Sequence, residues 1–157
     1  MRRISILSGI LIFTFLLAFP SDIHSQELKE IKLLKPRLEA GKPLMQALNE
    51  RRTSREFSGE ELPLQVLSDL LWAADGINRP DSGKRTAPSA VNWQNIDIYA
   101  AMAQGLYLYD PKEHSLKPVL AEDIRALTGK QDFVKDVPLN LIYVADFSKI
   151  TRGTDED

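Results

Sequence analysis

The chain has 157 residues, of which 43% are hydrophobic and 27% charged, as in an ordinary soluble globular domain, so a disordered or fibrous chain is excluded. Its 20 basic and 22 acidic residues nearly cancel, which excludes the strongly positive surface that binds nucleic acid. The absence of cysteine excludes disulfides, thiolate metal sites and a cysteine nucleophile, and two histidines are too few for a histidine-rich metal centre.

The first 25 residues predict an export signal. Met1-Arg2-Arg3 is a short basic head, and residues 4–19 form an apolar run that ends before Pro20. Small residues follow, so cleavage is expected near Ser25, and the mature chain is expected to be exported to the periplasm or secreted. The alternative is an uncleaved membrane anchor, for which the run is at the short limit. A membrane contact is therefore expected only through this segment, if it stays uncleaved.

A polar lead-in and a short helix are expected next. Residues 26–42 are rich in Lys, Glu and Leu, and Pro36 limits any helix there to one or two turns. A helix follows from residue 43 to residue 49 or 50, with one apolar face. That face consists of Leu44, Ala47 and Leu48.

The middle of the chain predicts a second helix and then two loops. Residues 64–74 contain four apolar residues that repeat every three to four positions: Leu67, Leu70, Leu71 and Ala74. Residues 76–86 and 87–94 read as loops because glycine, proline and small polar residues are frequent there.

Strands dominate the remainder. Alternation of apolar and polar residues predicts strands at 96–100 and 105–109, and a return strand at 116–120. A third helix is expected from residue 121 or 122 to residue 128. Residues 139–145 are apolar enough to predict a buried central strand.

The run Arg51-Arg52-Thr53-Ser54-Arg55 places three guanidinium groups and two hydroxyls directly after a helix. Arginine makes forked, charge-assisted hydrogen bonds to phosphate, and hydroxyls can bind the remaining oxygens. Basic residues at a helix C-terminus also complement the helix dipole. The run is therefore open to two interpretations, a phosphate site and a solvated helix cap.

Residues 85–94, Arg-Thr-Ala-Pro-Ser-Ala-Val-Asn-Trp-Gln, form a polar loop that leads into a strand. The amides of Asn92 and Gln94 each offer a donor and an acceptor, which suits the pyrimidine edge of a flavin. The alternative is a turn-rich loop that only satisfies its own backbone.

Two other residues have simpler interpretations. Trp72 is expected in the core or at a dimer interface, and His114, in an expected turn, is expected at the surface. No side chain is assigned as a proton donor or a nucleophile.

Together, in this order and about thirty residues apart with a helix between them, the two segments resemble the nitroreductase family. The resemblance implies that FMN is the cofactor, that Arg51, Arg52 and Thr53 hold its phosphate, and that Arg55 approaches its pyrimidine ring. It also implies that the flavin is lined by Pro88, Ser89 and Asn92.

Residues 70–76, followed by residues 85–90, are closer still to the branch of that family that includes the SagB-type dehydrogenases. Two departures from the pattern stand beside this likeness. Asn95 occupies a position where proline often follows the glutamine, and Val91-Asn92-Trp93 replaces the Gly-Ala-Leu-Tyr common in the SagB branch.

The resemblance implies an α+β fold, nitroreductase-like, with a mainly antiparallel sheet flanked by helices and an intertwined homodimer that binds FMN at the subunit interface. It implies an oxidoreductase that passes hydride or electrons through flavin to a small-molecule acceptor, with a reduced nicotinamide or another compound as donor. Family members continue with a long central helix and further flavin contacts. Residues 43–157 are therefore expected to be the N-terminal portion of the domain, truncated at its C-terminus. The alternative function is a non-catalytic exported remnant or binding module of the same fold.

Overall fold

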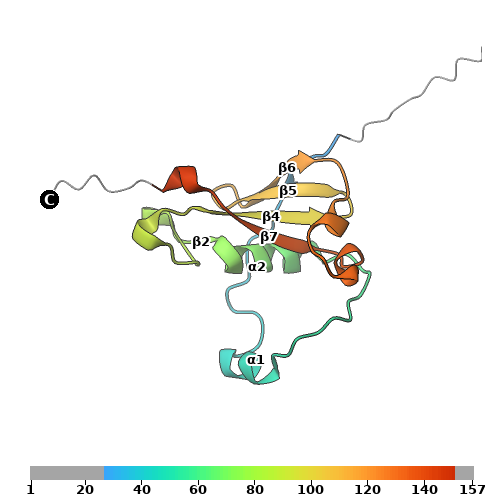
Figure 1. Cartoon of the computed structure of the whole chain (residues 1–157). Coiled ribbons are helices and arrows are strands. Elements are labelled where there is room, and N and C mark those ends of the chain that lie inside the picture. The colour runs from blue at the N-terminus through green and yellow to red at the C-terminus, as the bar shows by residue number, and fades with distance from the viewer. Residues whose placement is uncertain (1–26, 151–157) are drawn as a thin grey trace, which may run out of the picture.

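The computed structural model describes residues 27–150, so the expected export signal at residues 1–25 lies outside the described part. One antiparallel sheet of five strands lies against a helix, α2 (Leu64–Asp75), as Figure 1 shows. A short helix, α1 (Leu44–Glu50), lies further from the sheet at the end of two extended stretches of chain. This arrangement confirms the predicted α+β class with a mainly antiparallel sheet and helices.

The sheet has the strand order β1-β6-β5-β4-β7, and every neighbouring pair is antiparallel. The bounds are β1 (Ile31–Lys32), β4 (Ile96–Met102), β5 (Gly105–Asp110), β6 (Ser115–Leu120) and β7 (Asn140–Ala145). The strands predicted at 96–100, 105–109 and 116–120 are confirmed. Alternate residues of a strand point to the same face, and Tyr107 and Tyr109 of β5 are both buried.

The apolar face of α2 forms the core together with the sheet. Leu67 and Leu71 are one helical turn apart, and Leu71 has no exposed surface. They belong to one buried cluster with the sheet residues Ile98, Ala100, Tyr107, Tyr109 and Leu116. The helix ends at Gly76, where a Cβ atom would lie 2.3 Å from the ring of Trp72, so only glycine fits.

Two segments differ from their predicted secondary structure. Residues 76–86 are not an open loop but a hairpin of β2 (Ile77–Arg79) and β3 (Lys84–Arg85), closed by a turn that ends at the left-handed Gly83. The predicted third helix is reduced to one 3-10 turn, Arg125–Leu127. The Asp123 carboxylate accepts hydrogen bonds from the backbone and the guanidinium of Arg125, which favours a turn over a longer helix.

The predicted burial is wrong at two places. β7 was predicted as a central strand, but in the described sheet it pairs only with β4 and lies at the edge. Tyr143 and Val144 of β7 are 58% and 41% exposed. Leu70, predicted on the inner face of α2, is exposed. Apolar composition indicated burial, but it carries no information on how many neighbours a strand has.

The lead-in is extended rather than helical. His114 connects it to the body of the domain, by which we mean α2 and the five-stranded sheet. The Nε2 atom of His114 lies 2.9 Å from the carbonyl oxygen of Leu34 and 2.7 Å from Oγ of Ser68 on α2. The hydroxyl of Tyr109 lies 3.0 Å from Nδ1. His114 is therefore a half-buried bridge between three elements, not the surface residue that its turn predicted.

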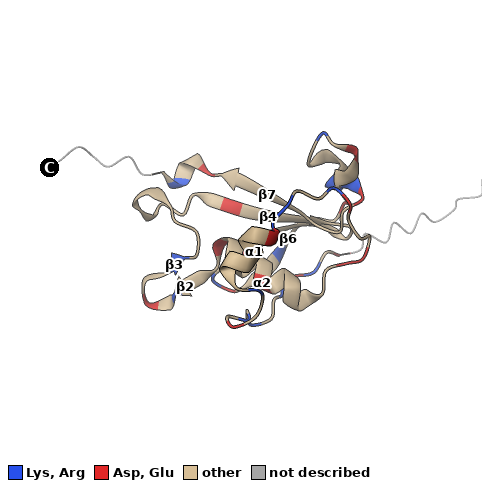
Figure 2. Ribbon diagram, turned by 90° about the horizontal axis from the view of Figure 1, so that it is seen from below, with Lys and Arg blue, Asp and Glu red and all other residues tan. Residues whose placement is uncertain are grey.

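Figure 2 shows basic and acidic residues interspersed over the side of the molecule that carries both helices. Between residues 27 and 150, no cluster of three or more histidine, cysteine, aspartate or glutamate side chains could hold a metal ion. No helix in that range is long and apolar enough to cross a membrane.

Candidate functional site

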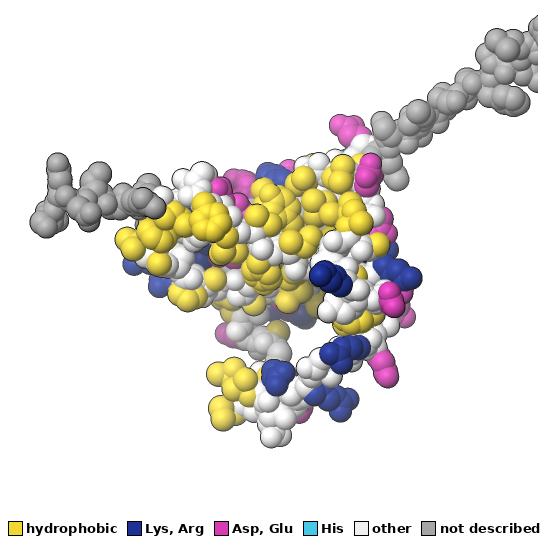
Figure 3. Space-filling view, in the orientation of Figure 1, with side chains coloured by type: hydrophobic (Ala, Val, Ile, Leu, Met, Phe, Trp, Pro, Cys, Tyr) yellow, Lys and Arg dark blue, Asp and Glu magenta, His cyan; other side chains and the backbone are white. Residues whose placement is uncertain are grey.

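The first predicted segment lies on the most exposed part of the described chain. Every residue from 41 to 60 is exposed, and α1 buries none of its residues. Figure 3 shows Lys and Arg side chains along the chain that leaves α1. Within residues 27–150, no hydrogen bond or ion pair engages the four side chains predicted to bind phosphate and ring: Arg51, Arg52, Thr53 and Arg55.

One stacking contact ties this segment to the body. The ring of Phe57 stacks on that of Phe133, with centroids 5.5 Å apart and planes inclined by 26°. The three arginines before it have no carboxylate partner within residues 27–150. Three guanidinium groups free of acidic partners suit a dianion such as a phosphate monoester.

The second predicted segment lines a pocket at the other end of α2. A pocket of about 150 Å³ opens between the C-terminal end of α2, the loop at residues 87–94 and the β4-β7 edge. Pro88 and Ser89 line it, together with Gln94. Asn92 does not line it and is exposed. Two of the three residues predicted to line the flavin are therefore brought together there.

A buried ion pair forms one wall of this pocket. The Arg85 Nη1 atom donates to Oδ2 of Asp75, and their side chains are 13% and 11% exposed. Burial raises the pKa of Asp75, and the Arg85 guanidinium opposes this only in part. Thr86 donates from its backbone to Gly76 (2.8 Å) and from its hydroxyl to the Trp72 carbonyl (3.1 Å). The start of the loop is thereby fixed to the end of α2.

Asp75 and Arg85 were not predicted as site residues. They lie ten positions apart on either side of a hairpin that was predicted as a loop, so no helical or strand periodicity relates them. The Pro80 and Gly83 turn is the signal from which that hairpin could have been predicted.

The loop backbone is strained. Val91, Asn92 and Gln94 have φ values of 48°, 59° and 49°, in the left-handed region that non-glycine residues avoid. Each such residue costs about 1–2 kcal/mol, and a β-branched valine is the least suited to it. Val91 is also 86% exposed. Strain of this kind clusters where a ligand or partner is bound.

The chemistry of the two segments suits the two ends of FMN, the cofactor that the sequence resemblance implies, and the described chain does not bond them to each other. The arginines fit its phosphate, and Ser89 and Asn92 supply polar groups for a ring edge. Between residues 27 and 150, no hydrogen bond or ion pair joins residues 51–55 to residues 85–94. A pocket of about 150 Å³ is also smaller than the roughly 300–1,000 Å³ of most small-molecule sites. This pocket alone is therefore smaller than a typical small-molecule site.

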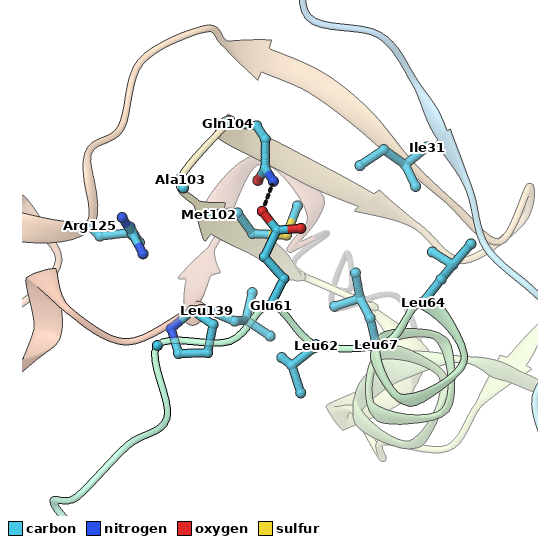
Figure 4. Close-up of a pocket in the computed structure, with 12 residues that line it drawn as sticks. Ile31, Glu61, Leu62, Leu64, Leu67, Met102, Ala103, Gln104, Arg125 and Leu139 are labelled. Atoms are coloured by element: carbon cyan, nitrogen blue, oxygen red, sulfur yellow. Dashed lines mark hydrogen bonds between the residues drawn. The ribbon is translucent and has the colours of Figure 1, made fainter.

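Figure 4 shows a different pocket, of about 480 Å³, at the N-terminal end of α2. Its wall is mainly apolar, and at one edge Gln104 Nε2 donates to Glu61 Oε1 at 2.5 Å. The Arg125 guanidinium, also in the wall, is already bonded to Asp123 and to the Val137 carbonyl. None of the predicted site residues lines this pocket.

The chain is similar to known proteins of the nitroreductase family. A model of the nitroreductase family matches residues 48–157, a range that includes both candidate segments. A curated relative from Methanocaldococcus jannaschii, named "putative nitroreductase", is 35% identical over 141 residues, which are 83% of this chain and 65% of that relative. This chain therefore spans slightly less than two thirds of the relative's length.

Two crystal structures with the same descriptive name are also similar. The protein from Ralstonia eutropha is 44% identical with a TM-score of 0.75, over 84% of this chain and 62% of that one. The protein from Anabaena variabilis is 20% identical with a TM-score of 0.59, over 81% of this chain and 29% of that one, and supports the fold alone.

Proposed function

Because the chain belongs to the nitroreductase family, we propose that it is an oxidoreductase that binds FMN and passes electrons through the flavin to a small-molecule acceptor. The observation that carries this proposal is that the family match includes both the arginine run and the strained loop. The cofactor supplies the electron transfer, and the protein supplies binding, orientation and charge.

Arg51, Arg52 and Thr53 bind the FMN phosphate in this proposal, and Arg55 places positive charge near the pyrimidine edge, where reduction builds negative charge. Their exposure and lack of acidic partners within residues 27–150 support these roles. Pro88, Ser89 and Asn92 line the ring from the other segment.

We place the site between two copies of the chain, with the arginines from one copy and the strained loop from the other. Three observations support a homodimer of this kind. The pocket beside the loop is small, no hydrogen bond or ion pair joins the two segments within residues 27–150, and α1 exposes Leu44, Met45 and Leu48 by 71%, 76% and 55%. Exposed apolar side chains grouped on one short helix are typical of a protein interface.

Flavin binding tests the proposal directly. The purified mature chain is titrated with FMN and with riboflavin, which lacks the phosphate, and quenching of flavin fluorescence is measured. Arg51→Ala should weaken FMN binding about tenfold, because a charged phosphate partner is lost, and should leave riboflavin binding unchanged. Lys130→Ala, an exposed cation outside both segments, is the control. A wild-type chain that binds neither flavin would refute the proposal.

Mixing two variants tests the placement between copies. One variant carries Arg51→Ala and Arg52→Ala, and the other carries Ser89→Ala and Asn92→Gly, so neither binds FMN alone. If each site uses both copies, unfolding and refolding them together restores about a quarter of the sites, because one site of each mixed dimer is native. If one copy supplies both segments, no site is restored.

The finer assignments are also part of the proposal. Residues 70–76 and 85–90 support a place in the SagB-like branch. We divide the chain into an export signal (1–25), a lead-in (26–42) and the N-terminal portion of the flavin domain (43–157). An exported enzyme of this kind needs an electron donor available outside the cytoplasm, either a reduced nicotinamide or another small molecule. N-terminal sequencing of the mature protein, with Gln26 as the expected first residue, tests the export signal.

A further inference from the structure

Gln94 makes the contacts that hold the strained loop together. Its backbone N–H donates to Oγ of Ser89 at 3.0 Å. Its side-chain Nε2 atom donates to the Gly83 carbonyl at 3.0 Å and to Oδ1 of Asn92 at 3.2 Å. Gln94 thus connects two of the predicted flavin residues to each other and to the β2-β3 hairpin.

These bonds leave Gln94 little capacity to bind a ligand by donation. A glutamine amide has two N–H donors, and both are used, one on Gly83 and one on Asn92. The amide orientation follows from the same contacts, because Nε2 faces two oxygen acceptors. Gln94 is also only half-buried, so its side chain is not required to fill the core. Its contacts indicate a role that is exerted through its neighbours.

The same bonds set the polarity of those neighbours. The Ser89 hydroxyl oxygen and the Asn92 side-chain oxygen each accept a hydrogen bond from Gln94. Each oxygen keeps one further acceptor position, whereas the donors, the Ser89 O–H and the Asn92 Nδ2–H₂, are all unused. Neither donor has a partner within residues 27–150. The loop therefore offers hydrogen-bond donors, and its complement is a ligand edge rich in acceptors.

We propose that Gln94 is a positioning residue whose side chain orients Asn92, beside a Ser89 held by the Gln94 backbone N–H, as a donor toward the carbonyl-bearing edge of the flavin. This inference rests on the proposed FMN function. It adds that the loop presents hydrogen-bond donors to the flavin. Donors at that edge stabilise the negative charge that reduction builds on the ring. Gln94 thereby raises the reduction potential of the bound flavin through the neighbours that it orients.

The test compares Gln94→Met with Asn92→Gly and with the double variant. Methionine has a similar length and no charge, so it removes the two side-chain donors without adding an electrostatic effect of its own. Glycine tolerates the left-handed backbone at position 92, so Asn92→Gly removes that side chain without new strain. Gln131→Met is the control for the glutamine substitution, because Gln131 is exposed and lies outside both segments.

The dissociation constant of FMN and the reduction potential of the bound flavin are measured for each variant. Gln94→Met should weaken FMN binding about tenfold, the equivalent of one lost hydrogen bond, and should lower the potential. Asn92→Gly should act in the same direction, and the double variant should be no worse than the more impaired single variant, because Gln94 acts largely through Asn92. A purely structural role would change stability but not the potential.

The outcomes separate this inference from the function on which it depends. If the wild-type chain does not bind FMN, the proposed function fails. If the wild-type chain binds FMN and Gln94→Met leaves affinity and potential unchanged, only the role of Gln94 is refuted. Fully additive effects in the double variant would also refute it, because Gln94 would then act independently of Asn92.

Discussion

The loop at residues 85–94 is bonded to α2 and to the β2-β3 hairpin, whereas α1 and residues 51–60 bury no side chain. Both regions carry residues predicted to bind the cofactor. The loop is oriented by contacts within its own copy of the chain. The arginine segment keeps one stacking contact, between Phe57 and Phe133, and an exposed apolar helix. In the proposed homodimer, one half of the site is therefore built by intramolecular folding and the other by association.

The largest effect on the free energy of unfolding is expected at the Asp75–Arg85 ion pair, which joins the end of α2 to the start of the loop. Arg85→Met leaves the Asp75 carboxylate buried without its cation and should reduce the free energy of unfolding by about 4 kcal/mol at neutral pH. Because Asp75 then has a folded-state pKa above its unfolded value, the loss should shrink as acid protonates the carboxyl. Urea unfolding at neutral and acid pH measures both effects.

A double variant is the control for that prediction. Asp75→Leu together with Arg85→Met removes both charges, so most of the lost stability should return. If the double variant is as unstable as Arg85→Met, the damage comes from lost packing and not from an unpaired charge.

The core between α2 and the sheet should be the next most sensitive. Leu71→Ala removes a side chain with no exposed surface and should reduce the free energy of unfolding by about 3 kcal/mol. Leu70→Ala is the matched control one position away, where the side chain is 40% exposed. Equal losses at the two positions would contradict the orientation of α2.

The sequence predicted the helix and strands of the body better than the contacts between distant segments. Helical spacing of Leu67 and Leu71 and strand alternation around Tyr107 and Tyr109 located the elements, because burial of a face leaves a local periodic pattern. The edge position of β7 and the bridge made by His114 depend on contacts between distant residues, for which no local pattern exists.

The same limit applies to the candidate site. The arginine run and the Pro88-Ser89 motif could be located by resemblance, since they are contiguous in the sequence. The Asp75-Arg85 pair and the bonds of Gln94 could not, because they depend on the hairpin geometry.

A smaller, pH-dependent effect is expected where the lead-in meets the body. Burial lowers the pKa of His114, whose neutral ring accepts from Tyr109 and donates to the Leu34 carbonyl, although Asp69 opposes this shift. Lys35 and Lys112 border the same groove. A folded-state pKa below the unfolded value of 6.5 means that this stability is present above pH 6.5 and is lost as the pH falls below it.

Hydrogen exchange at residues 31–37 across that pH range measures the effect. The protection factors of these amides, which compare the observed rate with the intrinsic rate at the same pH, should fall at acid pH in the wild-type chain, and His114→Asn should lose most of this pH dependence. A wild-type profile that does not change between neutral and acid pH would contradict the bridging role of His114.

The smallest effect on the free energy of unfolding of the monomer is expected for substitutions in α1. Leu48→Ala should change the free energy of unfolding by less than about 0.5 kcal/mol in dilute solution, because the side chain is 55% exposed and makes no core contact. At concentrations where two copies associate, Leu48→Glu should shift sedimentation toward the single copy and reduce FMN retention, since a charge is placed in the proposed interface. If Leu48→Ala instead destabilises the dilute chain as much as Leu71→Ala does, α1 packs against its own body. The contrast between the loop at residues 85–94, which is held by its own copy of the chain, and α1 with residues 51–60, which a second copy would cover, would then no longer hold.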